Sequence, residues 1–479
     1  MDQSTTPLYN QLIIHHKRHP ISLHVPGHKN GSLLGGQKYS YFHELLKLDV
    51  TELTGLDDLH SPEGVIQEAE ALLTAYYGTK KSYFLVNGST VGNLTMMLAV
   101  LNERDIVLVQ RNSHKSVLNG IELAGAKAVF LDPDFNEEWD VTGGVSLQII
   151  IRALNMYPKV KAIVLTYPNY YGMVNELEDI ITLAHERGIP VLVDEAHGAH
   201  FISGGHFPKS AVQLGADLVV QSAHKTLPAM TMGSFFHFNS EYISIEAVEK
   251  YLQLLQSSSP SYPIMASLDI ARSYIATYSD EDHAYLFSQI QSFKNGLRKL
   301  DKITVLNDSS KGDLLKVTIQ SANELSGFQM QALFEKKGIY TEMADPYNVL
   351  LILPLLKKDQ DYHFQQIVER ISQALSHVSK QKKNSPKHIY QPNISTLAMN
   401  PNEFNQHTIR NVLVEESMGE IAAERVTPYP PGIPLLVPGE RITEAIVEQM
   451  QYLIKSGARF QGNMDIYQGK IKVFEKKIY

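Results

Sequence analysis

Between residue 83 and about residue 234, short apolar runs alternate with amphipathic stretches, and this pattern limits the possible folds more than any other feature. Strands that alternate with helices require right-handed crossovers and a mostly parallel sheet covered on both faces. The runs are continuously apolar, as buried parallel strands are. The predicted strands are 83–87, 106–110, 128–131, 162–166, 191–194, 218–222 and 234–237, and the predicted helices include 90–101, 115–124 and 177–187. We therefore predict an α/β fold with a mostly parallel sheet.

The segments on either side follow other patterns. The run HVPGHKNGSLLGG (24–36) is too rich in turn residues for regular structure. After the Ser/Pro-rich residues 257–263, strands at 314–319 and 349–353 flank a helix at 328–337, which indicates a smaller, separate sheet. We predict an N-terminal arm (1–48), a large domain (49–275), a small α/β domain (276–390) and a turn-rich C-terminal segment (391–479).

The composition excludes several functions. None of the 479 residues is cysteine, which excludes disulfides, thiolate metal sites and a catalytic thiol. A net charge of −8 argues against sequence-independent nucleic-acid binding. The apolar run 349–356 is shorter than the roughly 20 residues of a membrane span, and the N-terminus lacks the pattern of a secretory signal. We expect a cytoplasmic protein without nucleic-acid or membrane partners.

Ligands of parallel α/β sheets bind beyond the carboxyl ends of the strands, and four motifs lie there. The first is Asn87-Gly88-Ser89-Thr90, where a strand runs into a helix. Its glycine permits close approach, while Ser89, Thr90 and the free amides of the helix N-terminus can bind an anion. The same residues also fit a simple N-cap. The absence of G-x-G-x-x-G and of a Walker motif argues against a bound nucleotide.

The second motif is Asp194-Glu195-Ala196-His197-Gly198, directly after an apolar strand. A carboxylate buried there needs a cation or hydrogen-bond donors. Asp194 could also cap a helix. A metal bound by Asp194, His197 and His200 would lack a further ligand, and H-E-x-x-H is absent, so we predict no metal site.

The third motif, Ser222-Ala223-His224-Lys225, places a lysine at the end of another apolar strand. Burial lowers a lysine pKa from about 10.4 and makes a neutral amine accessible, as a Schiff-base lysine requires. Alternatively, Lys225 reaches solvent along its alkyl chain. The fourth motif contains His114, which could stack on a planar ligand or cap the following helix.

Together the four motifs match the needs of pyridoxal phosphate. This cofactor requires an anion site, a carboxylate that keeps its pyridine nitrogen protonated, and a lysine for its aldehyde. The combination is much more specific than any single motif. With no cysteine nucleophile, Lys225 is the side chain placed for covalent chemistry.

The chain resembles the bacterial Orn/Lys/Arg decarboxylases, which are fold-type-I pyridoxal phosphate enzymes, over nearly its whole length. It looks most similar to short members without an N-terminal wing domain. The resemblance implies an aspartate-aminotransferase-like large domain, a homodimer or higher oligomer, and active sites at the subunit interface. The similar segments are HVPGHKNG (24–31), DVTELTGLDDLHSPEGVIQEAE (49–70), NGSTVGN (87–93), QRNSHKSV (110–117), VDEAHGAH (193–200), SAHKTLPAMTMGS (222–234) and PYPPGIPLLVPGE (428–440).

The resemblance also implies roles for individual residues. Lys225 would form the Schiff base with the cofactor, Asp194 would pair with the ring nitrogen, and His114 would stack on the ring. His197 would lie near the phenolic side of the ring, and Ser258 would reach the cofactor of the neighbouring subunit. The phosphate ligands would be Ser89, Thr90, Ser222 and His224.

One loop departs from the family pattern. Relatives often have Asn-Pro-Thr-Tyr where this chain has Tyr-Pro-Asn-Tyr at 167–170, which leaves the contacts of that loop open. His28 and Lys29 could line the cofactor entrance or order the N-terminal arm.

The predicted reaction is decarboxylation of arginine, lysine or ornithine. Arginine is slightly favoured because short family members often serve polyamine synthesis. The alternatives are another fold-type-I enzyme, an aminotransferase or an aldolase, and a non-catalytic pyridoxal phosphate-binding paralogue. The distal cation of the substrate needs a carboxylate partner, although each candidate could equally be a surface charge. The candidates are Asp57, Asp58, Glu415, Glu416 and Glu440.

Overall fold

The computed structural model describes residues 1–34, 37–306, 312–378, 393–428, 432–462 and 465–475. The chain forms two compact units, each built from separate stretches of sequence. Unit 1 contains residues 1–100 and 181–280, and unit 2 contains residues 101–180 and 281–479.

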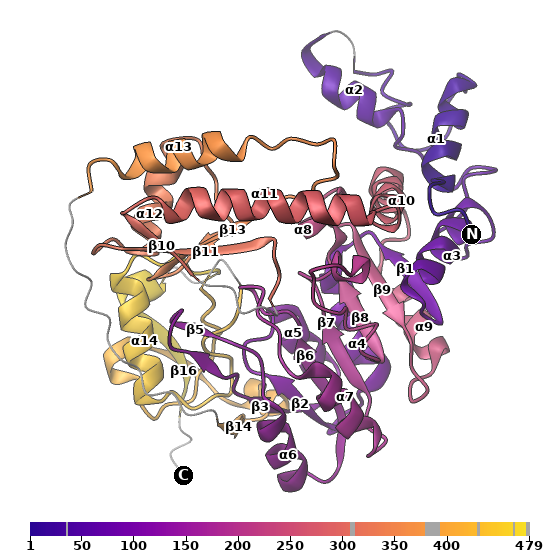
Figure 1. The fold of residues 1–479 in the computed structure, drawn as a ribbon. Helices are drawn as coiled ribbons and strands as arrows, with labels where there is room; N and C mark the ends of the chain where they lie inside the picture. The colour runs from indigo at the N-terminus through magenta and orange to yellow at the C-terminus, as the bar shows by residue number, and fades with distance from the viewer. Residues whose placement is uncertain (35–36, 307–311, 379–392, 429–431, 463–464, 476–479) are drawn as a thin grey trace. The chain divides into compact units, whose positions relative to one another are not determined.

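The strands of unit 1 lie in the order β1 (Lys81–Leu85), β9 (Ser234–Phe238), β8 (Leu218–Gln221) and β7 (Val191–Asp194) (Figure 1). β7 and β8 are parallel, whereas β9 is antiparallel to both β8 and β1. β1, β7 and β8 therefore all end at the same edge. The strand predictions are confirmed to within two residues, because each run is almost fully buried.

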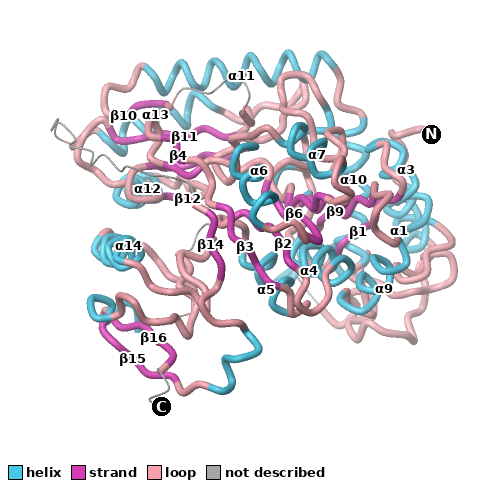
Figure 2. Tube along the Cα trace, turned by 90° about the horizontal axis from the view of Figure 1, so that it is seen from below, coloured by secondary structure: helices cyan, strands magenta, loops and turns pink. Residues whose placement is uncertain are grey.

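The helix α4 (Gly88–Val100) packs against β1, β8 and β9 and against α9 (Ile245–Leu255) (Figure 2). A glycine permits this close packing, since a Cβ at Gly92 would lie 2.7 Å from the Val220 side chain. The other helices of unit 1 are α1 (Pro7–Lys17), α2 (Ser40–Leu46), α3 (Val65–Tyr77), α8 (Ala223–Thr226) and α10 (Tyr262–Ala276).

The N-terminal residues are anchored on α10. Arg272 and Asp269 form a fully buried ion pair of 2.7 Å, and Asp269 accepts from the backbone N–H of Leu8. Arg272 in turn donates to the carbonyl of Gln3. Residues 24–34 form turns without helix or strand, as predicted; Gly35 and Gly36 lie outside the described residues.

Unit 2 contains a second set of buried strands. β6 (Val160–Thr166), β2 (Ile106–Gln110) and β3 (Lys127–Leu131) are parallel, and β14 (Ile394–Thr396) adds antiparallel to β3. β14 comes from the C-terminal segment, so this segment extends the sheet. The helices of this part are α5 (Lys115–Leu123) and α6 (Leu147–Met156). The helix α7 (Leu177–His185) begins in unit 2 and ends in unit 1.

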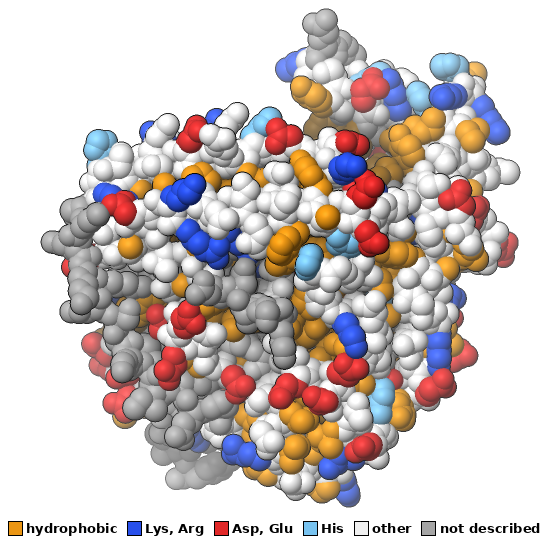
Figure 3. Space-filling model, in the orientation of Figure 1, with side chains coloured by type: hydrophobic (Ala, Val, Ile, Leu, Met, Phe, Trp, Pro, Cys, Tyr) orange, Lys and Arg blue, Asp and Glu red, His pale blue; other side chains and the backbone are white. Residues whose placement is uncertain are grey.

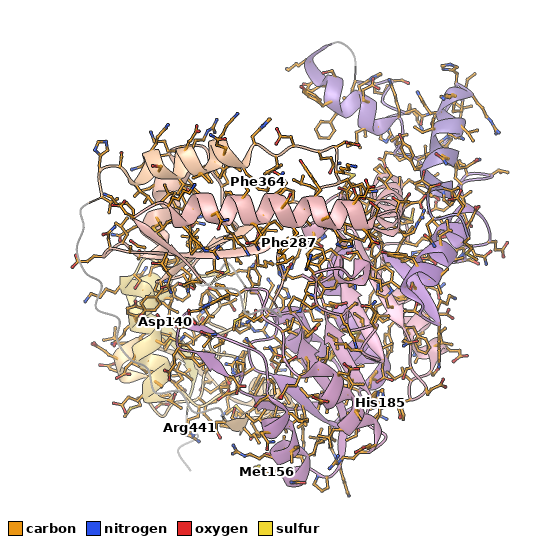
Figure 4. The ribbon with its side chains drawn as sticks, viewed as in Figure 1. Asp140, Met156, His185, Phe287, Phe364 and Arg441 are labelled. Atoms are coloured by element: carbon orange, nitrogen blue, oxygen red, sulfur yellow. The ribbon has the colours of Figure 1, made fainter. Side chains whose placement is uncertain are left out.

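A separate antiparallel sheet also lies in unit 2, in the order β10 (Ile303–Val305), β11 (Lys316–Ser321), β13 (Asn348–Ile352) and β12 (Met343–Ala344). Its helices are α11 (Asp280–Arg298), α12 (Gly327–Glu335) and α13 (Phe364–Leu375). Phe364, labelled in Figure 4, lies at the start of α13. Its ring packs on that of Phe293 of α11, with ring centroids 4.9 Å apart. The predicted smaller sheet is confirmed.

The C-terminal segment has its own apolar cluster, formed mainly by Val412, Val426, Leu436, Met450 and Ile471. Its elements are β15 (Ile409–Leu413), α14 (Glu444–Lys455) and β16 (Lys470–Phe474), and unit 2 also holds the hairpin β4 (Phe135–Asn136) and β5 (Val141–Thr142). The short 3-10 helices are Gln37–Tyr39, Phe201–Ser203, Pro401–Gln406, Val414–Glu416 and Asp465–Gln468.

Acidic and basic side chains are intermixed over the face shown in Figure 3. Several large apolar side chains of the N-terminal region are exposed, including Ile21 (89%), Leu23 (92%) and Tyr41 (93%). Within the part of the chain that the structure describes, no helix has the length and apolarity needed to cross a bilayer.

Candidate active site

Three chain segments with polar side chains meet at the strand-end edge of unit 1. β7 ends at Asp194, β8 leads through Ser222 into α8, and β1 leads through Asn87 into α4. This arrangement follows from the parallel directions of β1, β7 and β8. It brings seven predicted site residues to one edge: Ser89, Thr90, Asp194, His197, Ser222, His224 and Lys225.

The N-terminus of α4 has the backbone and hydroxyl groups that the predicted anion site requires. Gly88 has a φ of +77°, a left-handed conformation that favours glycine and turns the chain from β1 into the helix. The first amides of a helix have no intrahelical acceptor and attract anions. The hydroxyl of buried Ser222 donates to Ser89 Oγ at 2.8 Å, and Thr90 is exposed beside it. These groups fit a phosphate.

His224 lies on α8, and its Nδ1 is 2.9 Å from the carbonyl oxygen of Gly233. A carbonyl only accepts, so Nδ1 carries the hydrogen. Burial lowers the pKa of His224, although the bond to Gly233 partly opposes that shift. His224 Nε2 can therefore donate to a phosphate only when the ring is protonated, which a bound anion would favour.

Asp194 is 2% exposed and accepts two hydrogen bonds from uncharged donors. Asn93 Nδ2 on α4 lies 2.9 Å from Oδ2, and the backbone N–H of Ala196 lies 3.1 Å from Oδ1. A buried carboxylate needs such donors, and two of them leave oxygen lone pairs free for a further donor. Asp194 can therefore accept a hydrogen bond from a cationic ring nitrogen.

Glu195, the next residue, has a different role. It is fully buried and accepts from Ser210 Oγ at 2.8 Å, Ala211 N at 2.7 Å and Gln221 Nε2 at 2.6 Å. Burial raises the pKa of Glu195 to about 8, against the effect of these donors. A Cβ at Gly198 would lie 2.7 Å from Glu195 Cγ, so the glycine leaves room for this carboxyl group.

The network continues beyond Glu195. Gln221 Oε1 is 3.1 Å from His237 Nε2, and His237 Nδ1 is 2.8 Å from Ser82 Oγ. Burial lowers the pKa of His237 to about 3, so this ring is neutral. Glu195, Gln221 and His237 thus tie the ends of β7 and β8 to β9 and β1.

Lys225 lies on the short helix α8 that follows β8, and its side chain is only partly buried. Its Nζ is 3.1 Å from His197 Nε2, and His197 is 4% exposed. The imidazole orients the amine at the same edge as Asp194. The edge therefore offers an amine that could take an aldehyde and a carboxyl group that could pair with a ring nitrogen.

His114 belongs to unit 2 and caps α5, where its Nδ1 accepts from Ser116 N at 3.3 Å. The structure therefore shows the capping contact, while ring stacking stays a prediction. Ser258 is exposed between α9 and α10. The neighbouring Ser257 donates its N–H to Asn87 at 3.0 Å, and His60 contacts the Ser257 carbonyl at 2.8 Å.

The candidate partners of a distal substrate cation have structural contacts or lie exposed. Asp57 accepts backbone N–H bonds from Gly64, Ile66 and Gln67 and so caps α3. Glu440 pairs with Arg111 at 2.8 Å. Asp58 accepts the backbone N–H of His60, whereas Glu415 and Glu416 are exposed.

Two open points concern the N-terminal run and the loop after β6. His28 Nε2 is 3.1 Å from Asp49, and Lys29 Nζ donates to the His24 carbonyl, so both order the arm. In the loop, Asn169 donates to the Thr142 carbonyl at 2.9 Å and Tyr170 donates to Glu342 at 2.6 Å. The described residues contain no group of three or more potential metal ligands.

Sequence reasoning missed the roles of Asn93, Glu195 and Gly198. Asn93 lies four positions after Ser89 on one helix and thus on the same face, which was an available signal. Nothing in the local pattern predicted that Glu195 faces Gln221 and Ser210.

The chain matches two models of one protein family. The family model "Orn/Lys/Arg decarboxylase, major domain" matches residues 6–317, and its C-terminal domain model matches residues 383–477. The chain belongs to the Orn/Lys/Arg decarboxylase family. It is a decarboxylase, and its cofactor is pyridoxal phosphate. The polar groups at the N-terminus of α4, the buried carboxyl group of Asp194 and the amine of Lys225 fit that cofactor.

Individual proteins are similar to the chain over nearly its full length. The chain is 46% identical to the uncharacterized protein YaaO of Bacillus subtilis, with 98% of each chain covered. It is 32% identical to an arginine decarboxylase of the same organism, covering 100% of this chain and 99% of the relative. The solved Francisella novicida lysine decarboxylase LdcF superimposes with a TM-score of 0.81 at 20% identity, covering 98% of this chain and 81% of that one. The likeness confirms the fold-type-I architecture.

Proposed function

We propose that this decarboxylase converts arginine to agmatine and CO₂, with lysine and ornithine as the alternative substrates. The observation that carries the proposal is the edge formed by Lys225, Asp194 and the N-terminus of α4. Similarity favours arginine, because relatives named arginine decarboxylase are 32% identical to the chain over nearly its full length. Relatives named lysine decarboxylase are 22–24% identical.

When bound, pyridoxal phosphate supplies an electron sink for the pair left behind by CO₂. Each residue of the edge then has a task. Lys225 would bind the aldehyde carbon through Nζ with loss of water, and His197 would orient that amine. Asp194 would hold the proton on the ring nitrogen.

The residues that would hold the phosphate at the N-terminus of α4 are Ser89, Thr90 and Ser222, together with His224 in its protonated form. The first backbone amides of the helix, which follow the turn at Gly88, would stabilise the charge of that phosphate. His114 would stack on the ring, and Ser258 would contact the cofactor of a second subunit.

The proposal includes a homodimer or higher oligomer that acts in the cytoplasm, in polyamine synthesis. The exposed apolar side chains of the N-terminal region support an assembly, because monomeric proteins rarely expose many such groups together. Sedimentation of the purified protein tests this part separately.

The deciding experiment incubates the purified protein with arginine, lysine and ornithine and identifies the products by mass spectrometry. Agmatine and an equal amount of CO₂ are expected from arginine. Cadaverine or putrescine instead would reassign the substrate. Keto acid without CO₂ would indicate an aminotransferase, and bound cofactor without any product would indicate a non-catalytic paralogue.

Lys225→Ala tests the site itself. The variant lacks the amine that we propose as the attachment point of the cofactor aldehyde, so borohydride should trap no pyridoxal phosphate on it. Mass measurement of the intact protein detects the adduct. Continued trapping of one cofactor per chain in Lys225→Ala would show that another lysine is the attachment site.

A further inference from the structure

Asp194 is held by Asn93, a residue outside the set proposed to bind the cofactor. Asn93 Nδ2 donates to Asp194 Oδ2 at 2.9 Å, and both residues are almost completely buried. The N–H of Ala196 takes the other oxygen. An ionised carboxylate can accept about four hydrogen bonds, so two neutral donors leave capacity for a cationic partner.

The sequence around Asn93 makes this contact possible. A Cβ at Gly92 would lie 2.7 Å from Val220 Cγ1 and 2.9 Å from Leu85 Cδ1, so α4 approaches the strands closely at this point. Val220 is the cross-strand neighbour of Asp194. The close approach over Val220 therefore carries the next residue, Asn93, to the carboxylate.

The N-terminus of α4, one turn before Asn93, is the proposed anion site. Ser89, four residues before Asn93, accepts the hydrogen bond from Ser222. Residues four apart lie on one face of a helix. One rigid helix thus sets the position of the phosphate site and the orientation of Asp194.

We propose that Asn93 is a positioning residue, whose amide holds the Asp194 carboxylate in the orientation that pairs with the cofactor ring nitrogen. The inference rests on the role proposed above for Asp194. An amide is needed at this position, because a carboxylate there would be 2.9 Å from Asp194, and two such groups share a proton.

A double-mutant cycle tests the inference without measuring turnover. Equilibrium dialysis of the full-length protein against pyridoxal phosphate gives its dissociation constant for the wild type, Asn93→Ala, Asp194→Ala and the double variant. Asn93→Ala should weaken binding about tenfold, the effect of losing a hydrogen bond to a charged group. In the Asp194→Ala background the same change should alter binding less than about twofold, because the groups act together. Equal effects in both backgrounds would overturn the inference.

Thr95→Val is the matched control. Thr95 is fully buried on the same helix, and among the described residues its hydroxyl has no hydrogen-bond partner. The control should bind the cofactor as the wild type does. A loss of affinity in Thr95→Val equal to that in Asn93→Ala would show that any change in α4 weakens binding, which would contradict a specific role for Asn93.

Asn93→Asp keeps the shape of the side chain and guards against misfolding of the alanine variant. It should bind the cofactor more weakly than Asn93→Ala does. In a pH titration followed by the absorbance of the bound cofactor, the midpoint should differ from that of the wild type. Wild-type affinity and absorbance would overturn the inference. If Asp194→Ala alone leaves affinity unchanged, the proposed site assignment fails as well, which separates the two failures.

Discussion

Asp194 in unit 1 and Glu440 in unit 2 are both buried carboxylates, but their partners differ. Asp194 receives hydrogen bonds from the uncharged Asn93 and Ala196 N–H. Glu440 faces the guanidinium of Arg111 at 2.8 Å and accepts the N–H of Val437 at 2.9 Å. A carboxylate that accepts only from neutral donors can still pair with a cationic ligand, whereas one already paired with arginine holds the chain together.

Arg111 strengthens the second role. Besides Glu440, it donates to the carbonyls of Pro434 and Leu435, each at 2.9 Å. One side chain directly after β2 therefore fixes a turn of the C-terminal segment. Both motifs resemble those of the family, yet Glu440 is already paired with a cation, whereas the hydrogen-bond partners of Asp194 within the described residues are neutral.

The largest expected effect is that of Asp194→Ala. Removing a preorganised charge that stabilises the transition state lowers kcat/KM by about 10²–10³-fold. Steady-state kinetics on the substrate found by product analysis would measure it, with Asp194→Asn as a variant of the same shape. The comparison breaks if Asp194→Ala is as active as the wild type.

Arg111→Ala should act mainly on stability. It leaves Glu440 buried without its cation, which costs about 2–3 kcal/mol in the free energy of unfolding for a pair that solvent still reaches. Urea titration measures the loss. Replacing both partners, with Arg111→Met and Glu440→Leu, should recover part of it, and failure of the double variant to do so would mean that the two carbonyl contacts dominate.

Glu195→Gln should change the pH dependence of stability. The folded state holds a proton on Glu195 up to a pKa of about 8, whereas the unfolded chain releases it near the ordinary value of 4.5. The folded state thus binds more protons in this window, so this group reduces stability as the pH rises from about 4.5 to about 8. Relative to the variant, the wild type should lose about 1 kcal/mol per pH unit there.

Urea titrations of both proteins at several pH values would measure that slope. Gly198→Ala provides a related check, because its methyl group would press on Glu195 without removing the titration. A difference between wild type and Glu195→Gln that stays constant with pH would mean that Glu195 is ionised throughout in the folded protein.

Asp57→Ala should have the smallest effect. Burial alone would raise the pKa of Asp57, but its backbone N–H donors outweigh burial and hold the pKa below the ordinary value. Losing this cap of α3 costs about 1 kcal/mol in the free energy of unfolding, with activity retained. Thermal unfolding and kinetics measured side by side would check both parts. Lost activity at unchanged stability would instead make Asp57 a substrate ligand.

Much of the fold could be predicted from the sequence. The strand 106–110 and the strand 191–194 match β2 and β7 residue for residue, because continuous apolar runs bounded by polar residues define buried strands. The placement of Lys225 and Asp194 at strand ends followed from the same runs. The strand 83–87 was displaced by two residues, because Val86 and Asn87 turn the chain toward α4.

The sequence by itself determined the strands, the helices between them, the family and the set of polar residues at the strand ends. Only the tertiary structure decided how those residues are paired. Asn93 meets Asp194 across 101 positions, and Arg111 meets Glu440 across 329. The physical reason is that hydrophobic periodicity records which face of a segment is buried, whereas the partner of a buried polar group depends on strand order and on how closely a helix approaches the sheet.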